Sequence, residues 1–87
     1  MIERKYLIIA GDGTDKGVAK VFYKLYVLRG TNLGRGLTLR RDDTGLYGVK
    51  YLIDAKGDTD EDIFDSLKRL NLHKAGLTVK LEDGVHA

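Results

Sequence analysis

Three groups of residues have types and spacings that could perform chemistry: a glycine-rich stretch, a run of alternating acids and a pair of histidines. The glycine-rich stretch is GDGTDKG, residues 11–17. Dinucleotide-binding loops use three glycines at fixed spacing, so that the backbone can approach a phosphate, but Gly17 comes one residue too late for that pattern. No Gly-Lys-Ser/Thr sequence follows, as a phosphate-binding P-loop requires. The stretch therefore indicates a flexible turn between a strand and a helix.

The alternating acids are Asp58, Asp60 and Asp62, which have the spacing that opens a calcium-binding loop. Such a loop needs a glycine at its sixth position and a glutamate at its twelfth. Ile63 and Arg69 stand at those two positions. The acids are instead typical of the first turn of a helix, where they interact favourably with the helix dipole.

Histidine and serine chemistry has little support in the sequence. His73 and His86 are the only imidazoles, and the chain has no cysteine, so we expect no metal site. Ser66 is the only serine, and no histidine lies one turn away to activate it. We therefore expect a protein that is not an enzyme and has no cofactor.

The composition indicates a single domain over residues 1–87, with room for one modest core. Because cysteine is absent, the fold must hold by packing alone, as in reducing compartments. No apolar run approaches the length of a membrane span, and the N-terminus lacks the features of a signal peptide. These features favour a cytoplasmic protein without a membrane partner.

The formal net charge is only +2, but the charges are unevenly distributed. No acidic residue lies between Asp15 and Asp42. Seven cationic residues fall in that interval: Lys16, Lys20, Lys24, Arg29, Arg35, Arg40 and Arg41. Such a block either marks a surface for an anionic partner or is simply solvated.

Hydrophobic patterning predicts six elements. Thr59 is the expected N-cap of the second helix, since three acids follow it and basic residues come later. We expect strands at 4–10, 37–41, 46–54 and 77–82, and helices at 15–28 and 60–73.

The segment DKGVAKVFYKLYVLRG, residues 15–30, fits two structures. Its valine, phenylalanine and tyrosine content favours a strand, which an Asp12-Gly13 turn could introduce. Its period favours a helix, because most of its apolar residues fall on one half of a helical wheel and the lysines fall opposite. Propensity and period therefore disagree.

An internal repeat favours the helix. Residues 6–29 align with residues 51–74 without a gap, and seven of the 24 positions are identical. The halves, at about 4–44 and 49–84, each read as strand, helix and strand. The expected fold class is α+β, a ferredoxin-like βαββαβ plait with a four-stranded antiparallel sheet and two helices on one face. The alternative, with residues 17–29 as a strand, is a four-stranded meander plus one helix.

Several strings also resemble the RNA recognition motif (RRM) family. These are TDKGVAKVFYKLY (14–26), RDDTG (41–45), and SLKRLN followed by GLTVKLE (66–71 and 76–82). The resemblance implies the same βαββαβ order and RNA as a partner. Members of that family stack bases on aromatic residues of the first and third strands.

This chain departs from the family at the stacking positions. Leu46 and Gly48 occupy the two third-strand positions. Tyr6 would be the first-strand aromatic, but the repeat aligns it with Tyr51, and strand alternation places both on the helix side.

The uncovered sheet face and the loop RGTNLGRG, residues 29–36, are the candidate binding surfaces. We expect a small non-enzymatic binding domain that engages nucleic acid, either RNA or a single strand, through cations. The candidate nucleic-acid-binding residues are Arg29, Arg35, Arg40, Arg41, Lys50, Lys5 and Lys80.

The alternative is a protein target. A short chain without catalytic residues could be a protein-binding module or inhibitor of the kind that phages and mobile elements use against host machinery, acting through its sheet face or first helix. An apolar stripe on the sheet face, Leu7, Ile9, Leu46 and Leu52, could bind such a protein or a second copy in a homodimer.

Overall fold

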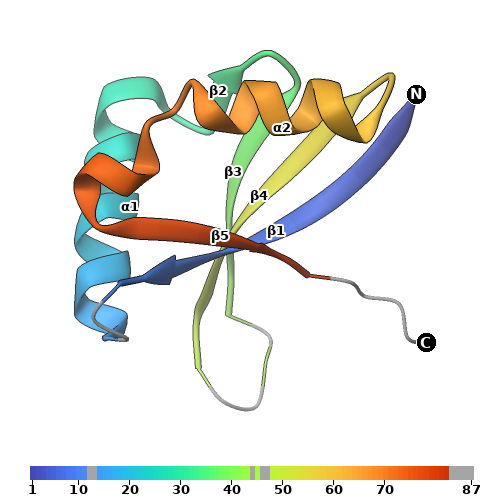
Figure 1. The fold of residues 1–87 in the computed structure, drawn as a ribbon. Helices are drawn as coiled ribbons and strands as arrows, with labels where there is room; N and C mark the ends of the chain where they lie inside the picture. Colours follow the sequence, from blue (N-terminus) through green and yellow to red (C-terminus); the bar gives the residue numbers. More distant parts are fainter. Residues whose placement is uncertain (12–13, 44, 46–47, 83–87) are drawn as a thin grey trace.

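The computed structural model describes residues 1–11, 14–43, 45 and 48–82. Within these residues the chain is α+β, with a five-stranded sheet and two α-helices (Figure 1). None of the described helices is long and apolar enough to cross a membrane. The elements are β1 (Ile2–Ala10), α1 (Asp15–Arg29), β2 (Asn32–Gly34), β3 (Leu37–Asp42), β4 (Lys50–Gly57), α2 (Asp60–Lys68), the 3-10 helix η1 (Leu72–Ala75) and β5 (Leu77–Leu81).

The five strands form one sheet in the order β2-β3-β4-β1-β5, and every neighbouring pair is antiparallel. The N-terminal strand β1 is therefore internal, between β4 and β5. In the β1–β4 ladder Leu7 lies opposite Leu52. β5 pairs with residues 6–10 of β1, and the Glu82 N–H donates to the Lys5 carbonyl at 2.8 Å, so residues 2–4 of β1 have no neighbouring strand on that side.

The helix expected at residues 15–28 is confirmed as α1, and the alternative meander is wrong. The Thr14 hydroxyl accepts a hydrogen bond from the Gly17 N–H at 3.4 Å and caps the first turn. At the other end Gly30, at φ 68°, donates its N–H to the Tyr26 carbonyl at 2.7 Å. Helical period and both caps outweigh the strand propensity of the valine and aromatic residues.

The predicted four-stranded sheet is wrong by one strand. Asn32–Gly34 forms the short β2, which pairs with Leu37 and Thr38 of β3. Its central residue, Leu33, is buried in the core. Three residues are too short to show a strand period, and the surrounding glycines are typical of a loop, so the sequence hides this strand.

Three predicted boundaries are wrong by three residues or more, and one of them is the end of the strand expected at 46–54, which extends to Gly57. The helix expected at 60–73 ends at Lys68, because Asn71 has a left-handed backbone at φ 52° that a right-handed helix cannot contain. The chain resumes as η1, which buries Leu72. The strand expected at 46–54 begins only at Lys50, after Gly48 at φ 111°. Residues 46 and 47 lie outside the described residues.

The core lies between the sheet and the helices. One buried cluster contains Val18 of α1, Ile63 and Leu67 of α2, and strand residues such as Ile53 and Leu39. Both helices therefore pack on the same face of the sheet. Within the described residues no helix packs on the opposite face, which we call the open sheet face.

Positions aligned by the sequence repeat occupy equivalent places. Ile8 and Ile53 are both buried in the core. Tyr6 and Tyr51 both pack against it from the helix side. The aligned pair Leu7 and Leu52 lie directly opposite each other in the β1–β4 ladder, so an approximate two-fold axis passes between them.

Candidate binding surfaces

The open sheet face carries cations that are paired with acids of the same face. The guanidinium of Arg40 binds the Asp54 carboxylate through two hydrogen bonds, with Nε to Oδ2 at 2.7 Å and Nη2 to Oδ1 at 3.2 Å. Asp42 lies 3.9 Å from the same guanidinium. The hydrogen bond to Asp54 raises the pKa of Arg40 above its usual value. Arg40 is thus engaged within its own chain.

Two of the four lysines on this face are also paired with acids. Lys50 Nζ lies 3.5 Å from Glu82 Oε1, and Lys56 Nζ lies 3.5 Å from Glu3 Oε1. Because β1 separates β4 from β5, the pair of Lys50 and Glu82 passes over the open face of β1. Lys5 and Lys80 are exposed on this face and form no ion pair with another described residue. The open sheet face therefore carries both ion pairs and single lysines.

The apolar stripe predicted on this face is mostly covered. Leu52 is only 2% exposed, although its side chain does not belong to the core cluster between sheet and helices. Its ladder neighbours are Leu7 and Arg40. Leu7 and Ile9 are half-buried, and Leu46 lies outside the described residues. The stripe is therefore not a continuous exposed surface.

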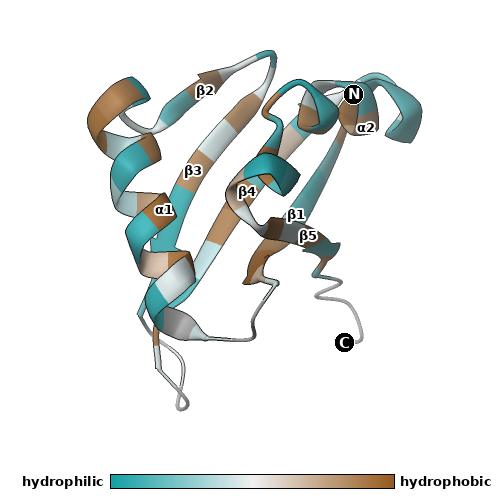
Figure 2. Cartoon of the chain, turned by 60° about the vertical axis from the view of Figure 1, so that its left-hand side comes forward, coloured by the Kyte–Doolittle hydropathy of each residue, from teal (hydrophilic) through white to brown (hydrophobic). Residues whose placement is uncertain are grey.

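The outer side of α1 has the opposite character. Lys16, Lys20 and Lys24 are exposed and form no ion pair with another described residue. They recur every four residues, so they form a row with about 6 Å between neighbours. Tyr23 and Val27, which fall on the same side of the helical wheel, are 69% and 63% exposed. Hydrophobic residues alternate with hydrophilic ones along α1 (Figure 2).

The β2–β3 hairpin holds Arg35 on a tight turn beyond the end of α1. Arg35 has a left-handed backbone at φ 54°, between Gly34 at φ 83° and Gly36 at φ 78°. Gly36 is fixed against β4, because its carbonyl accepts a hydrogen bond from the Lys56 N–H at 2.9 Å. The exposed Arg35 is therefore displayed on an anchored turn.

Two more arginines complete this surface. Arg29 is exposed at the last turn of α1. Arg41 is exposed on β3 opposite Tyr51, whose ring packs on Phe22 of α1 with 4.4 Å between ring centroids. We call the set of α1 and hairpin cations the basic side. Its members are Lys16, Lys20, Lys24, Arg29, Arg35 and Arg41.

Of the positions that the RRM resemblance singles out, the structure describes Tyr6 and Gly48, and neither places an aromatic ring on the open sheet face. Tyr6 packs against the core from the helix side, as predicted. Burial, followed by the negative charge of Asp60, raises the pKa of Tyr6 above its ordinary value of 10.0. Gly48 precedes β4 and has no side chain to stack on a base.

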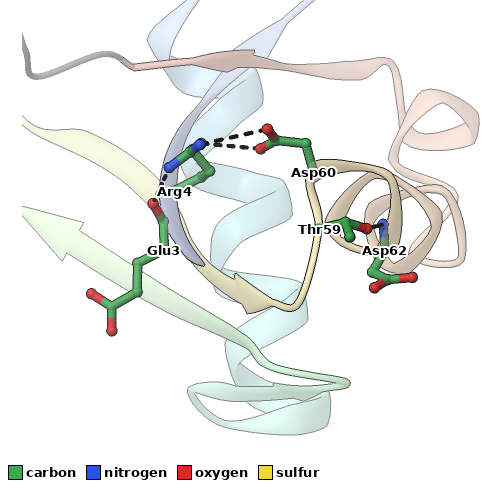
Figure 3. A network of polar contacts seen from close by, with 5 residues as sticks. All are labelled: Glu3, Arg4, Thr59, Asp60 and Asp62. Carbon is green, nitrogen blue, oxygen red and sulfur yellow. Dashed lines mark hydrogen bonds and ion pairs between the residues drawn. The ribbon is translucent and has the colours of Figure 1, made fainter. Parts of the chain in front are cut away.

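The acids at the start of α2 have a structural role (Figure 3). The Thr59 hydroxyl accepts a hydrogen bond from the Asp62 N–H at 3.1 Å and caps the helix. Arg4 Nε donates to Asp60 at 3.0 Å, and Arg4 Nη1 donates to the Glu3 carbonyl at 3.0 Å. Arg4 thus ties α2 to β1 and occupies a backbone acceptor of this strand.

The residues considered for catalysis or metal binding are not brought together. Ser66 Oγ donates a hydrogen bond to the Asp62 carbonyl at 3.1 Å, within its own helix. His73 is exposed in η1, and His86 lies outside the described residues. Among the residues that the structure describes, no three histidine or acidic side chains gather in a group that could hold a metal ion.

The structure divides the seven predicted nucleic-acid-binding residues between two surfaces. Arg29, Arg35 and Arg41 lie on the basic side, whereas the other four lie on the open sheet face. The three lysines and Tyr23 of α1 are not among these seven predicted residues. The signal that could have included them is the four-residue spacing of the lysines.

Comparisons of this chain with protein-family models, with curated proteins and with solved structures gave no match.

Proposed function

We propose that the protein is a small non-enzymatic binding domain that engages single-stranded nucleic acid, RNA or DNA, through its basic side. We further propose that its fold is a ferredoxin-like βαββαβ plait with an internal repeat, to which β2 is an addition. The order β3-β4-β1-β5 and the two helices on one face support this fold assignment.

One observation carries the functional proposal: none of the six cations of the basic side has a carboxylate partner among the described residues. On the sheet face three of the five described cations have one, and only Lys5 and Lys80 do not. Like charges four residues apart destabilise a helix by about 0.2–0.5 kcal/mol per pair. The row of Lys16, Lys20 and Lys24 contains two such pairs. An anionic partner would offset this repulsion.

The position of the exposed aromatic side chains favours a single strand over a duplex as the partner. Proteins that bind single strands combine backbone-tracking cations with aromatic side chains on which bases stack. Tyr23 is exposed on α1 beside the lysine row. Tyr26 is also exposed, on the flank of the helix where its ring stacks on Phe22. The sheet face lacks exposed aromatic residues among those described, so the stacking groups of this protein are on the helix.

The proposal is tested by titrating a labelled single-stranded oligonucleotide at low and moderate salt. Four or five phosphate contacts predict a slope of about −3 to −3.5 in a plot of log affinity against log salt. Replacing Lys16, Lys20 and Lys24 with Gln should reduce the magnitude of that slope by about 2.

The matched control is a triple variant on the other face, with Lys5, Lys50 and Lys80 replaced by Gln. It removes the same number of charges and should change the slope by much less. No binding by the unaltered chain at low salt would refute the proposal, as would a larger loss in the sheet-face variant.

A second candidate is a protein-binding module or inhibitor acting through α1. It is favoured by the exposed apolar side chains of Val27 and Leu28, which nucleic acid does not require. Val27→Ser discriminates the two candidates. Binding of an oligonucleotide should be unaffected by this change, whereas binding of a protein partner should weaken.

A further inference from the structure

The outward sides of α1 and α2 carry opposite charges. By sequence, α1 has four cationic residues and one acid, whereas α2 has four acids and one cation. Both helices pack on the same face of the sheet, so both outward sides belong to one helical layer. The layer therefore has a basic half and an acidic half.

The internal repeat places these charges at equivalent positions. When residues 6–29 are aligned with residues 51–74, Lys16 aligns with Glu61 and Lys20 aligns with Asp65. In each helix the two residues are four apart, so both pairs have the same spacing of about 6 Å. All four side chains belong to exposed residues. The basic pair and the acidic pair are thus matched in geometry and opposite in sign.

The chain does not bring the two pairs together itself. Within the described residues, the ion pairs lie within or across the sheet or join Arg4 to Asp60, and none joins α1 to α2. Each helix instead holds like charges four residues apart, which is locally unfavourable. Among the residues that the structure describes, neither pair of charges has a partner, so a second molecule could supply the complement.

Apolar side chains lie beside both pairs. On α1 these are Tyr23 and Val27. On α2 Phe64 is 55% exposed, with the ammonium of Lys68 above its ring at 4.7 Å from the centroid. A hollow beside α2 is lined in part by Tyr6, Phe64 and Leu81. Apolar contacts could accompany the ion pairs at both places.

We propose that two copies of this chain form a dimer through their helical layers, with α1 of each copy against α2 of the other. A two-fold axis would form both contacts at once and close the assembly. The interface differs from a dimer through the sheet face, which the sequence had suggested. It would also cover the lysine row, so self-association and nucleic-acid binding would compete for α1.

Two short helices give an interface near the lower end of specific protein–protein contacts. Sedimentation velocity at low salt should therefore show concentration-dependent dimerisation between about 10 µM and about 1 mM. The dimer should weaken with added salt, because its ion pairs are exposed at the rim. A chain that stays monomeric throughout this range overturns the proposal.

Charge reversal tests which surfaces meet. The variant Lys16→Glu/Lys20→Glu should lose at least tenfold in self-association, and so should Glu61→Lys/Asp65→Lys. An equimolar mixture of the two variants should form a one-to-one dimer, because both helix contacts then join opposite charges. The matched control Lys5→Glu/Lys80→Glu makes the same change in net charge on the sheet face and should dimerise like the unaltered chain.

The quadruple variant, with all four reversals, exchanges the charges between the helices and keeps the net charge. It should recover self-association while losing oligonucleotide binding at α1, so the two proposals can fail separately. All substitutions are at exposed positions, and circular dichroism checks that each variant is folded. Dimerisation that survives in both double variants, or a mixture that stays monomeric, would contradict the proposed interface.

Discussion

The open sheet face and the outer side of α1 are both rich in cations, but most cations of the sheet face form ion pairs, whereas those of α1 form none with a described residue. On the sheet, cross-strand neighbours lie about 5 Å apart, so acids and bases on adjacent strands can pair. Lys56 and Glu3 are such a directly opposite pair. Arg40 and Asp54 are diagonal neighbours, which long side chains can also bridge. On α1 the neighbours of each lysine along the row are other lysines. The comparison teaches that counting cations on a surface is insufficient, since what matters is which of them lack a partner.

The apolar side chains of the two regions also differ in exposure. Replacing the buried one should give the largest change in the free energy of unfolding. Leu52 on the sheet face is 2% exposed, whereas Leu28 at the end of α1 is 69% exposed. Leu52→Ala should lower the free energy of unfolding by about 2–5 kcal/mol, and Leu28→Ala should change it by no more than about 0.5 kcal/mol. Urea denaturation measures both. Equal changes in the free energy of unfolding would show that the Leu52 side chain is not buried.

In the hairpin that displays Arg35, replacing Gly36 by alanine should destabilise the fold more than replacing Gly34. A Cβ at Gly36 would lie 2.5 Å from the Lys56 carbonyl oxygen, whereas a Cβ at Gly34 would meet nothing within 4 Å. Both have positive φ, which costs a side chain about 1–2 kcal/mol. Gly34→Ala should show only that cost in thermal unfolding, and Gly36→Ala should exceed it. The reverse order would show that the turn is not anchored on β4.

Releasing a paired cation should make the sheet face resemble α1. Asp54→Asn removes the carboxylate that binds Arg40 and should lower the free energy of unfolding by about 1 kcal/mol or less, because the pair is partly exposed. It should also strengthen oligonucleotide binding slightly, since Arg40 becomes available. Asp62→Asn removes one charge from α2 without touching Arg40 and serves as the control. If Asp54→Asn leaves both quantities unchanged, the ion pair is not formed in solution.

The smallest expected change in stability concerns Tyr6, which packs against the core, whereas Tyr23 is exposed on α1. The pKa of Tyr6 is raised in the folded state, mainly by burial, so folding favours its neutral form. The resulting stability is fully present below pH 10 and is lost as the pH rises through the folded-state pKa. Tyr6→Phe should make this alkaline loss of stability smaller, because phenylalanine does not ionise. Alkaline denaturation curves that are identical for the two chains would contradict the assigned burial.

Much of the fold was predictable because its signals are local. Thr14, Thr59 and the apolar period identify both helices, and the repeat resolves the ambiguity over residues 15–28. The short β2 was not predictable, since only the isolated Leu33 in a glycine-rich loop hints at it. The early end of α2 depends on the left-handed backbone of Asn71, which asparagine tolerates but does not require.

The candidate site was less predictable than the fold, for a physical reason. Strand alternation correctly places Arg40, Lys50 and Leu52 on the open face. Alternation does not show that Arg40 and Lys50 are paired with acids or that Leu52 is covered, because both depend on strand order and register. The three lysines of α1 could have been selected from their spacing alone.

The central claim is that the basic side, rather than the open sheet face, is the working surface. The most direct measurement is a titration of the isotope-labelled protein with a single-stranded oligonucleotide, followed by amide chemical shifts. The largest changes are predicted in residues 16–29 and around Arg35, with small changes in β5 and in residues 50–54 of β4. Changes concentrated on β1, β4 and β5, or no changes at low salt, would contradict the account.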